Sequence, residues 1–516
     1  MKKSQMIIGI IGLITLIVGL VISNYIVDFA GLAILTVVLM SMFGVKHNLI
    51  KITLCMILLT VVLSWIIPQG YFNAGELVKN DITRVGIFDF VTYGLLGMYY
   101  FTVLVTFLFV LGAFYQFLSK LGAYQKLTDK ISKRWKGKEI LFSLIISFVF
   151  AVLASMVNEY LIILAFVPFV ITILSKLNVD KIGSFVTTFG AILVGILGST
   201  ISTKVAGMNI QYFGLKYTDN LLDKILMFVI AYAIYSLFNV MHLKKTLASN
   251  KTSKSSKAKK ETKEIVNEDL FSNAVKGSDK SNTIPLIVVG VIAILVTVLA
   301  YIPWNTVFGV DWFSTALTKV NETNLFGVPL FSYILGNVSE FGAWDLFGVQ
   351  VVMLISIVVL QICYKVSMDD TIEAFGEGFK KVSKLVLVLL LAYVILEFAV
   401  MYPVIPTILG SVLGSKFNVF TTSIAGIVTG LFTSEYQYAV NLLYSFFTTS
   451  YANNLNVVSI ILQSTYGLVS FFAPSSAMLL VGLSYLDIPY KDWMKYIWKF
   501  LVAMLVVIIV MAFIIA

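Results

Sequence analysis

The chain has 516 residues, of which 59% are hydrophobic and only 12% are charged, about half the charged share of an average soluble domain. This composition excludes a soluble globular protein and predicts an all-α polytopic membrane protein. The net charge of +10 does not indicate a nucleic-acid partner, because the basic residues lie in short loops and in one Lys- and Ser-rich stretch. Both cysteines lie in apolar runs, so no disulfide framework is expected.

Eleven apolar runs are predicted to cross the membrane, and two of them are unusually long. The first run follows Lys2 and Lys3 and lacks a small-residue cleavage motif, so we expect it to remain as the first helix. In chain order the runs are 6–22, 25–44, 50–67, 99–118, 182–213, 223–242, 284–302, 346–364, 385–404, 456–486 and 497–514.

Two further apolar runs, 139–174 and 420–450, are interrupted midway by polar residues. Irregular backbone at membrane depth is tolerated only where it lines a cavity or is buried in protein. We therefore predict that both runs are re-entrant hairpins, which enter the membrane and leave on the same side.

The distribution of Lys and Arg predicts the orientation of these segments. With the N-terminus in the cytoplasm, 30 of the 37 basic residues fall on the cytoplasmic side and 7 on the outer side. This asymmetry favours eleven crossings of the cell membrane, with the C-terminus outside. The first hairpin then enters from the cytoplasm and the second from outside.

Two hydrophilic stretches have separate predictions. Residues 243–283 contain many lysines among serines and too little apolar surface to fold, which predicts a disordered cytoplasmic linker. Residues 368–384 begin with acidic side chains and end with lysines, which is typical of an amphipathic helix on the inner membrane surface.

An internal repeat relates the two hairpins. Each hairpin carries Glu-Tyr at its polar interruption, at Glu159-Tyr160 and at Glu435-Tyr436. Each is followed by a long apolar run that polar residues break, and 40 residues separate Glu159 from Ser199 as they separate Glu435 from Ser475. An inverted repeat with discontinuous helices is typical of a secondary transporter.

The repeat predicts the domain organisation. The expected segments are scaffold helices (1–118), a first repeat with hairpin 139–174 and broken helix 182–213 (119–242), the linker (243–283), scaffold helices with the surface helix (284–384), and a second repeat with hairpin 420–450, broken helix 456–486 and the last helix (385–516).

The polar residues at the hairpin tips and helix breaks are the candidate substrate or ion ligands. Hydroxyl groups supply neutral donors and acceptors, and the freed backbone ends of broken helices suit carboxylates or cations. The candidates are Asn158, Glu159, Ser199, Thr200, Ser202, Thr433, Ser434, Glu435, Ser475 and Ser476.

Intramembrane charges are functional hypotheses by default. Beside the two tip glutamates stand Glu397, within an apolar run, and Lys204, just after the first break, as charge partners. Three carboxylates against one lysine leave a local formal charge of −2. For Glu397 a structural pairing is as well supported as a functional role.

The sequence lacks the residues that a zinc site or ATP hydrolysis would require. Only His47 and His242 occur, both near membrane ends, and no phosphate-binding loop motif is present. We therefore expect no metal site and no cofactor. The prediction is a carrier driven by a Na⁺, H⁺ or exchange gradient, and not an enzyme. The alternative from another functional class is a membrane enzyme or a channel.

Several motifs resemble a known family. The stretch Gln463-Ser464-Thr465-Tyr466-Gly467, the stretch 472–477 (FAPSSA), the stretch 486–493 (LDIPYKDW) and Trp65-Ile66-Ile67-Pro68-Gln69-Gly70 are similar to YfcC-type carriers, which belong with the four-carbon dicarboxylate carriers of the ion transporter superfamily. The resemblance implies a scaffold and a transport domain, elevator-like motion, a homodimer in the membrane lipid, and roles for Glu159, Ser199 and Thr200.

The same resemblance leaves two substrate classes. The chain departs from the family pattern at Asn158, where a glutamate is usual, and at Ser202-Thr203, where Asn-Pro is usual. The excess of intramembrane carboxylates favours a basic amino acid, in an arginine/ornithine-type exchange. The alternative is a sodium- or proton-coupled dicarboxylate symporter, in which cations neutralise the glutamates.

Overall fold

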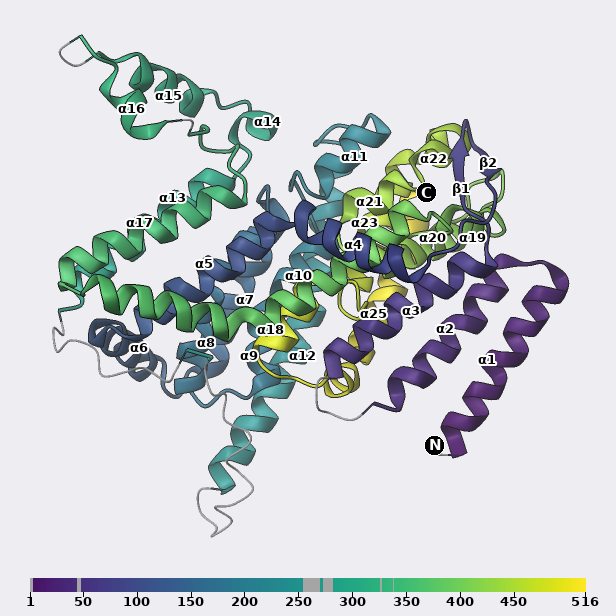
Figure 1. Ribbon diagram of the computed structural model, residues 1–516, viewed down its shortest axis with the longest axis horizontal. Coiled ribbons are helices and arrows are strands. Elements are labelled where there is room, and N and C mark those ends of the chain that lie inside the picture. Colours follow the sequence, from purple (N-terminus) through teal and green to yellow (C-terminus); the bar gives the residue numbers. More distant parts are fainter. Residues whose placement is uncertain (1–2, 44–47, 254–269, 272–281, 325–326, 337) are drawn as a thin grey trace.

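A computed structural model describes residues 3–43, 48–253, 270–271, 282–324, 327–336 and 338–516. Figure 1 shows a helical protein with α1 and α2 at one end, α13 and α17 at the other, and the remaining long helices between them. Most of the predicted linker, including Lys254, Lys257, Lys259, Lys260 and Lys263, lies outside the described residues.

The N-terminal helices pack in sequence order, α1 on α2 and α2 on α3. A Cβ added at Gly31 of α2 would clash with the backbone of Leu16 in α1, so the glycine permits this close crossing. The elements of this part are α1 (Lys3–Ile22), α2 (Tyr25–Ser41), α3 (Asn48–Ile66), β1 (Gly70–Asn73), β2 (Glu76–Lys79), α4 (Ile87–Tyr100) and α5 (Thr102–Ser119).

A short β-hairpin follows α3, and the sequence pattern did not predict it. β1 and β2 are antiparallel, with Gly70 opposite Lys79 and Asn73 opposite Glu76. Gly75 in the turn has φ +84°, a left-handed conformation that favours glycine. The Gly70 amide donates to the Pro403 carbonyl (2.9 Å), which attaches the hairpin to the end of α18.

The first repeat contains both predicted irregularities. Residues 157–159 interrupt the first hairpin, and residues 198–205 are non-helical between α10 and α11. Helix α7 has 18 residues and is itself long and apolar enough to cross a membrane, so the re-entrant path stays a prediction. The elements are α6 (Gly122–Trp135), α7 (Glu139–Met156), η1 (Tyr160–Ala165), α8 (Val167–Lys176), α9 (Lys181–Thr187), α10 (Phe189–Leu197) and α11 (Ala206–Phe213).

The start of the predicted linker is helical. Helix α12 (Leu221–Ser253) continues ten residues beyond position 243, so the prediction of disorder from 243 onward is wrong for this part.

Helices α13 (Ile284–Tyr301) and α17 (Leu346–Tyr364) form a pair whose connection projects away from the other helices (Figure 1). That connection contains α14 (Trp304–Phe308), α15 (Trp312–Glu322) and α16 (Leu330–Leu335).

Residues 368–384 do not form a separate surface helix, contrary to the prediction. They are the first half of α18 (Met368–Met401), which runs for 34 residues without a break. Gly378 lies so close to Gly112 of α5 that an added Cβ would clash with its backbone. Lys120, at the end of α5, also pairs with Glu373 (3.0 Å) and Glu377 (3.5 Å). These contacts hold the charged half of α18 against the helical bundle.

The second repeat follows α18 and also contains its predicted interruptions. Residues 433–435 are non-helical at the hairpin tip, and residues 470–476 separate α23 from α24. The elements are α19 (Ile405–Gly410), α20 (Val419–Phe432), α21 (Tyr436–Asn441), α22 (Tyr444–Ser450), η3 (Ala452–Asn454), α23 (Leu455–Val469), α24 (Ala477–Tyr485) and α25 (Tyr490–Ile515).

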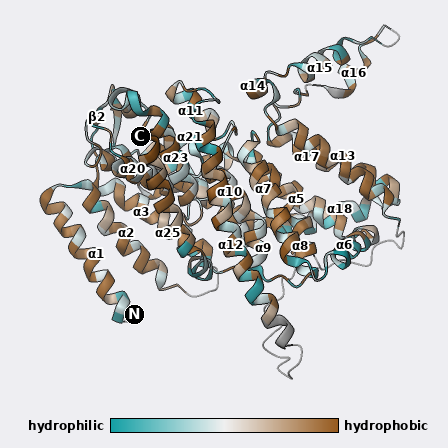
Figure 2. Cartoon of the chain, turned by 180° about the vertical axis from the view of Figure 1, so that it is seen from behind, coloured by the Kyte–Doolittle hydropathy of each residue, from teal (hydrophilic) through white to brown (hydrophobic). Residues whose placement is uncertain are grey.

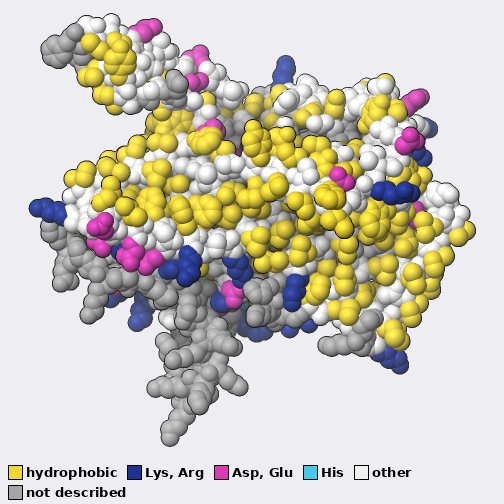
Figure 3. All heavy atoms as spheres, viewed as in Figure 1, with side chains coloured by type: hydrophobic (Ala, Val, Ile, Leu, Met, Phe, Trp, Pro, Cys, Tyr) yellow, Lys and Arg dark blue, Asp and Glu magenta, His cyan; other side chains and the backbone are white. Residues whose placement is uncertain are grey.

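The exposed surface is that of a membrane protein. Within the described residues, nine helices are long and apolar enough to cross a membrane. Figure 2 shows hydrophobic residues along most of the long helices. In Figure 3 hydrophobic side chains form a broad band, and many Lys and Arg side chains lie along its lower edge, near the projecting end of α12. The fold is therefore an all-α polytopic membrane fold.

Candidate functional site

The polar interruptions of the runs 139–174 and 420–450, which we call the two tips, converge on one lysine. The Nζ atom of Lys204 lies 3.2 Å from Oε2 of Glu159 and 3.6 Å from Oε2 of Glu435. The lysine comes from the non-helical segment 198–205 of the first repeat, and each glutamate precedes a short helix at its own tip. The Glu159 and Glu435 side chains are 9% and 17% exposed, whereas Lys204 remains 36% exposed. The cluster is therefore largely buried but can be reached through its lysine.

Neighbouring groups fix the direction of both carboxylates. Oε1 of Glu159 accepts a hydrogen bond from the Leu161 amide (3.1 Å). Oε1 of Glu435 accepts one from the Tyr393 hydroxyl of α18 (3.1 Å). Each glutamate thus uses one oxygen for a protein donor and turns the other toward Lys204, which leaves little rotational freedom to the ion pairs.

Each helix break is attached to the hairpin of its own repeat in the same way. In the first repeat the Ser155 carbonyl accepts hydrogen bonds from the Thr200 hydroxyl (3.1 Å) and the Ser202 amide (3.2 Å). In the second the Leu431 carbonyl accepts one from the Ser475 hydroxyl (2.9 Å). Each break is thus held by a carbonyl near the end of the helix that precedes its own tip.

A chain of hydrogen bonds joins the two repeats, and sequence reasoning missed most of its members. The Tyr436 hydroxyl donates to Oδ1 of Asn209 (2.7 Å), whose amide donates to Oε1 of Gln463 (3.5 Å). The Gln463 amide donates to the Ser199 carbonyl at the first break (2.6 Å). The detectable signal was a polar Gln-Ser pair, 463–464, inside a long apolar run.

Three hydroxyl groups near these breaks have no hydrogen-bond partner in the described part of the chain: those of Ser199, Ser202 and Ser464. Their residues are at most 1% exposed. A buried hydroxyl without a partner costs free energy unless water, an ion or a ligand satisfies it. Ser199 and Ser202 were predicted ligands, whereas Ser464 was not.

The remaining predicted residues lie at the edges of this region. Asn158 donates to the Gly342 carbonyl and accepts from the Thr203 hydroxyl (3.1 Å), so it joins the first tip to the loop before α17. Thr433, Ser434 and Ser476 are satisfied by local or adjacent backbone groups.

Glu397 does not join the Lys204 cluster. It is buried on α18, where its Cγ lies beside Gly97 of α4. Among the described residues no ion pair includes Glu397. Lys204, which was expected to pair with one of the three membrane glutamates, therefore pairs with Glu159 and Glu435, whereas Glu397 lies beside α4.

Gln463→Leu should uncouple the two repeats locally. The substitution keeps the volume but leaves the Ser199 carbonyl and the Asn209 amide without their partner. We expect a loss of about 1–3 kcal/mol in unfolding free energy, measured as a lower thermal unfolding temperature in detergent. Gln361→Leu, near the end of α17 and away from both breaks, is the control and should have no comparable effect. Equal stability of the two variants would contradict the role assigned to Gln463.

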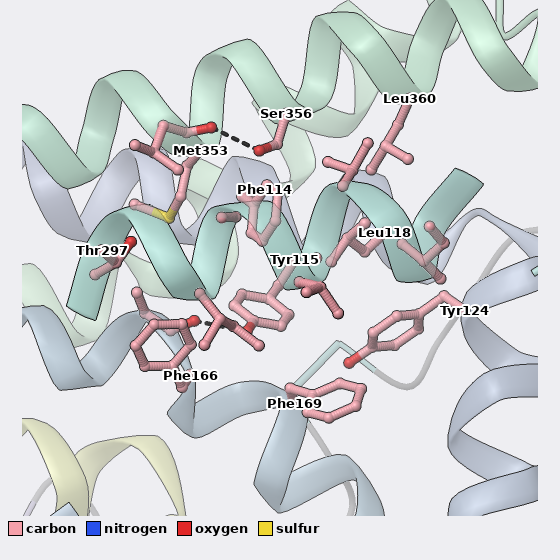
Figure 4. A pocket seen from close by; sticks show the side chains of 18 of the residues that line it. Phe114, Tyr115, Leu118, Tyr124, Phe166, Phe169, Thr297, Met353, Ser356 and Leu360 are labelled. Carbon is pink, nitrogen blue, oxygen red and sulfur yellow. Dashed lines mark hydrogen bonds between the residues drawn. The ribbon is translucent and has the colours of Figure 1, made fainter. Parts of the chain in front are cut away.

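An apolar cavity elsewhere in the protein is poorly suited to a polar substrate. Figure 4 shows a cavity of about 340 Å³ lined by α5, α6, α8, α13 and α17, with Phe114, Tyr115 and Phe169 in its wall. Among the described residues no charged side chain lines it. A polar substrate binds where polar groups converge. The Lys204 cluster meets this condition and the apolar cavity does not.

No group of three His, Cys, Asp or Glu residues within the described ranges is arranged to hold a metal ion.

Comparison with known families identifies the chain. Residues 46–516 match the family DcuC, described as C4-dicarboxylate anaerobic carrier. The chain belongs to this family. It is therefore a multi-pass membrane carrier and not an enzyme. The family match begins after α2, so α1 and α2 lie outside it.

Solved structures add a remote likeness. The YdaH transporter of Alcanivorax borkumensis is 11% identical, with 91% of this chain and 97% of that chain covered and a TM-score of 0.38. Because this score is low, the assignment to the carrier family depends on the sequence match alone. No curated protein matches the chain.

Proposed function

We propose that the protein is a cation-coupled secondary carrier of C4-dicarboxylates and that Lys204, between Glu159 and Glu435, binds one carboxylate of the substrate. The family match supports the substrate class. The single observation that supports the site is the convergence of both hairpin tips on one partly exposed lysine.

The charges of the cluster explain why a cation is required. Two glutamates and one lysine carry a net charge of −1 when all three are ionised. A dianionic substrate would add two further negative charges in a region of low dielectric, which is unfavourable without compensation. We infer that Lys204 turns from the glutamates to the substrate, and that H⁺ or Na⁺ neutralises the carboxylates it leaves.

The hydroxyl groups at the breaks complete the proposed site. Ser199, Ser202 and Ser464 lack partners in the described residues, so water, the coupling ion or the substrate would satisfy them. Thr200 and Ser475 keep the breaks attached to the hairpins and so position these groups.

Elevator-like motion would carry this site across the cell membrane. In this proposal 119–242 and 402–516 form the transport domain, and 1–118 and 284–401 form the scaffold, because the unbroken α18 moves the boundary expected at 385 to its end. Two copies make a homodimer. The basic edge seen in Figure 3 supports a cytoplasmic N-terminus. The Asn158 contact with Gly342 crosses the proposed domain boundary and would break during the motion.

A basic amino acid is the second candidate substrate. The net negative charge of the cluster and the motifs shared with YfcC-type carriers support it. In that case the substrate's own cationic group would take the position of Lys204 beside the glutamates, and exchange would replace cation coupling.

Uptake into proteoliposomes distinguishes the two candidates. Radiolabelled succinate and arginine would each be offered with and without a Na⁺ gradient or a pH gradient. We expect gradient-dependent succinate uptake, and at least a tenfold loss in both Glu159→Gln and Glu435→Gln. The exposed Glu322→Gln in α15 is the control and should transport normally. Arginine uptake without succinate uptake would overturn the dicarboxylate proposal in favour of the second candidate.

A further inference from the structure

A second cavity lies close to the Lys204 cluster. It measures about 310 Å³ and is lined by β1, the α18–α19 corner, α21 and α22. Tyr71, Pro403, Tyr438, Asn441, Tyr444 and Ser445 are among the residues that line it.

Tyr438 connects this cavity to the charged cluster. Tyr438 lines the cavity, and it belongs to α21, the short helix that begins directly after Glu435. It lies one helical turn beyond Glu435, whose carbonyl accepts its amide (3.3 Å). The inner end of the cavity is therefore adjacent to the second hairpin tip.

The first repeat reaches the same cavity from the other side. The ring of Tyr444, in the cavity wall, lies 5.2 Å from the ring of Tyr212 in α11, measured between centroids. Helix α11 begins two residues after Lys204. One short helix therefore joins the wall of the cavity to the lysine.

The lining suits a small anion in transit. Within the described residues no acidic or basic side chain lines the cavity, so an anion is neither repelled nor held tightly. The side chains of Tyr438, Asn441, Tyr444 and Ser445 have no hydrogen-bond partner in the described ranges, so their polar atoms are free to bind a carboxylate or its water. Once H⁺ or Na⁺ neutralises Glu159 and Glu435, as the proposed function requires, Lys204 at the inner end attracts the anion inward.

The β-hairpin forms a fixed outer wall. Gly70 is hydrogen-bonded to the Pro403 carbonyl (2.9 Å), and the Phe72 ring lies 5.0 Å from the Phe446 ring. These contacts hold β1 against α19 and α22. Figure 1 shows β1, β2 and α22 on the side opposite the projecting end of α12, which is the outer side in the proposed orientation.

We propose that this cavity is an entry vestibule through which a small dicarboxylate reaches Lys204, and that Tyr438 positions the substrate at its inner end. The substrate class rests on the proposed function, whereas the access route rests on the cavity alone. Tyr438→Phe should raise the KM for succinate severalfold with little change in kcat, because it removes one hydroxyl on the route and no charge.

Thiol labelling tests the route during transport. In a Cys363→Ser background, which removes the exposed native cysteine, Ser445→Cys would be treated with a membrane-impermeant methanethiosulfonate. We expect succinate uptake to fall at least tenfold, and succinate to slow the labelling. Thr449→Cys is the matched control, since it is exposed on the same helix but does not line the cavity. Normal uptake after complete labelling at position 445 would overturn the vestibule.

A measurement without substrate separates this proposal from the proposed function. In a variant with Glu159→Gln and Glu435→Gln, the rate at which the reagent labels Lys204→Cys reports access to the cluster. Adding Ser445→Trp should slow that rate at least tenfold, and adding Thr449→Trp should not. An unchanged rate would disprove the route even if succinate is transported. A slowed rate without any succinate transport would support the route and contradict the substrate class.

Discussion

Lys204→Met is expected to abolish transport. The substitution keeps the length of the side chain but leaves Glu159 and Glu435 facing each other without their shared cation. We expect uptake of succinate to fall about 100-fold or more, because the cation proposed to bind the substrate is lost. Removing one partner of a buried ion pair costs ~3–5 kcal/mol, and the 36% exposure of Lys204 makes that range an upper bound here.

A neutralised variant separates stability from transport. In Lys204→Met with Glu159→Gln and Glu435→Gln, all three charges of the cluster are removed together, so thermal unfolding should return close to that of the native protein. Transport should remain absent. If Lys204→Met alone transports at the native rate, or if the neutralised variant regains transport, Lys204 is not a substrate ligand.

Gly467→Val is expected to have the largest effect on folding. Gly467 of α23 meets α10 so closely that an added Cβ would clash with the Cα and N atoms of Leu197. The obstacle is backbone, which cannot rotate away, so the cost should exceed the ~1–3 kcal/mol typical of overpacking. Leu197 is the last residue before the first break, and the Gln463 bond to Ser199 spans the same crossing. We expect little folded protein in a membrane extract, measured by fluorescence-detected size exclusion.

Gly290→Val provides the matched control. Gly290 also lies within an apolar helix, α13, but an added Cβ there would meet no atom of the described residues within 4 Å. The control has the same change in helix propensity without the clash, so normal yield and elution are expected. Similar losses in both variants would attribute the defect to valine in a helix and contradict the close crossing of α10 and α23.

Local features of the sequence were sufficient for the class of protein and for the positions of the irregular segments. A bilayer requires apolar runs of about 20 residues, so composition alone excludes a soluble fold. Polar residues inside an apolar run are costly unless they line a cavity, which is why 158–159, 198–203, 433–435 and 472–476 stand out in the sequence. The repeat spacing then indicates a carrier, because discontinuous helices in paired copies are typical of one.

Boundaries that depend on packing were not predictable in this way. The charged segment 368–384 has the pattern of a surface helix, but Gly112, Gly378 and the ion pairs of Lys120 hold it in line with the following span. The first residues of the linker likewise continue α12. The β-hairpin at 70–79 was missed because strands of four residues carry too little periodic signal.

By itself the sequence determined a membrane carrier with two similarly interrupted apolar runs and marked their glutamates as costly intramembrane charges, because length, hydropathy and spacing are properties of the chain. Only the tertiary structure decided which charges meet. It brings Glu159 and Glu435, 276 residues apart, to Lys204, directs Glu397 to α4, and recruits Tyr393 and Gln463. The physical reason is that an ion pair or hydrogen bond forms within about 3–4 Å, and only the packing of α10, α18 and α23 sets distances on that scale between remote residues.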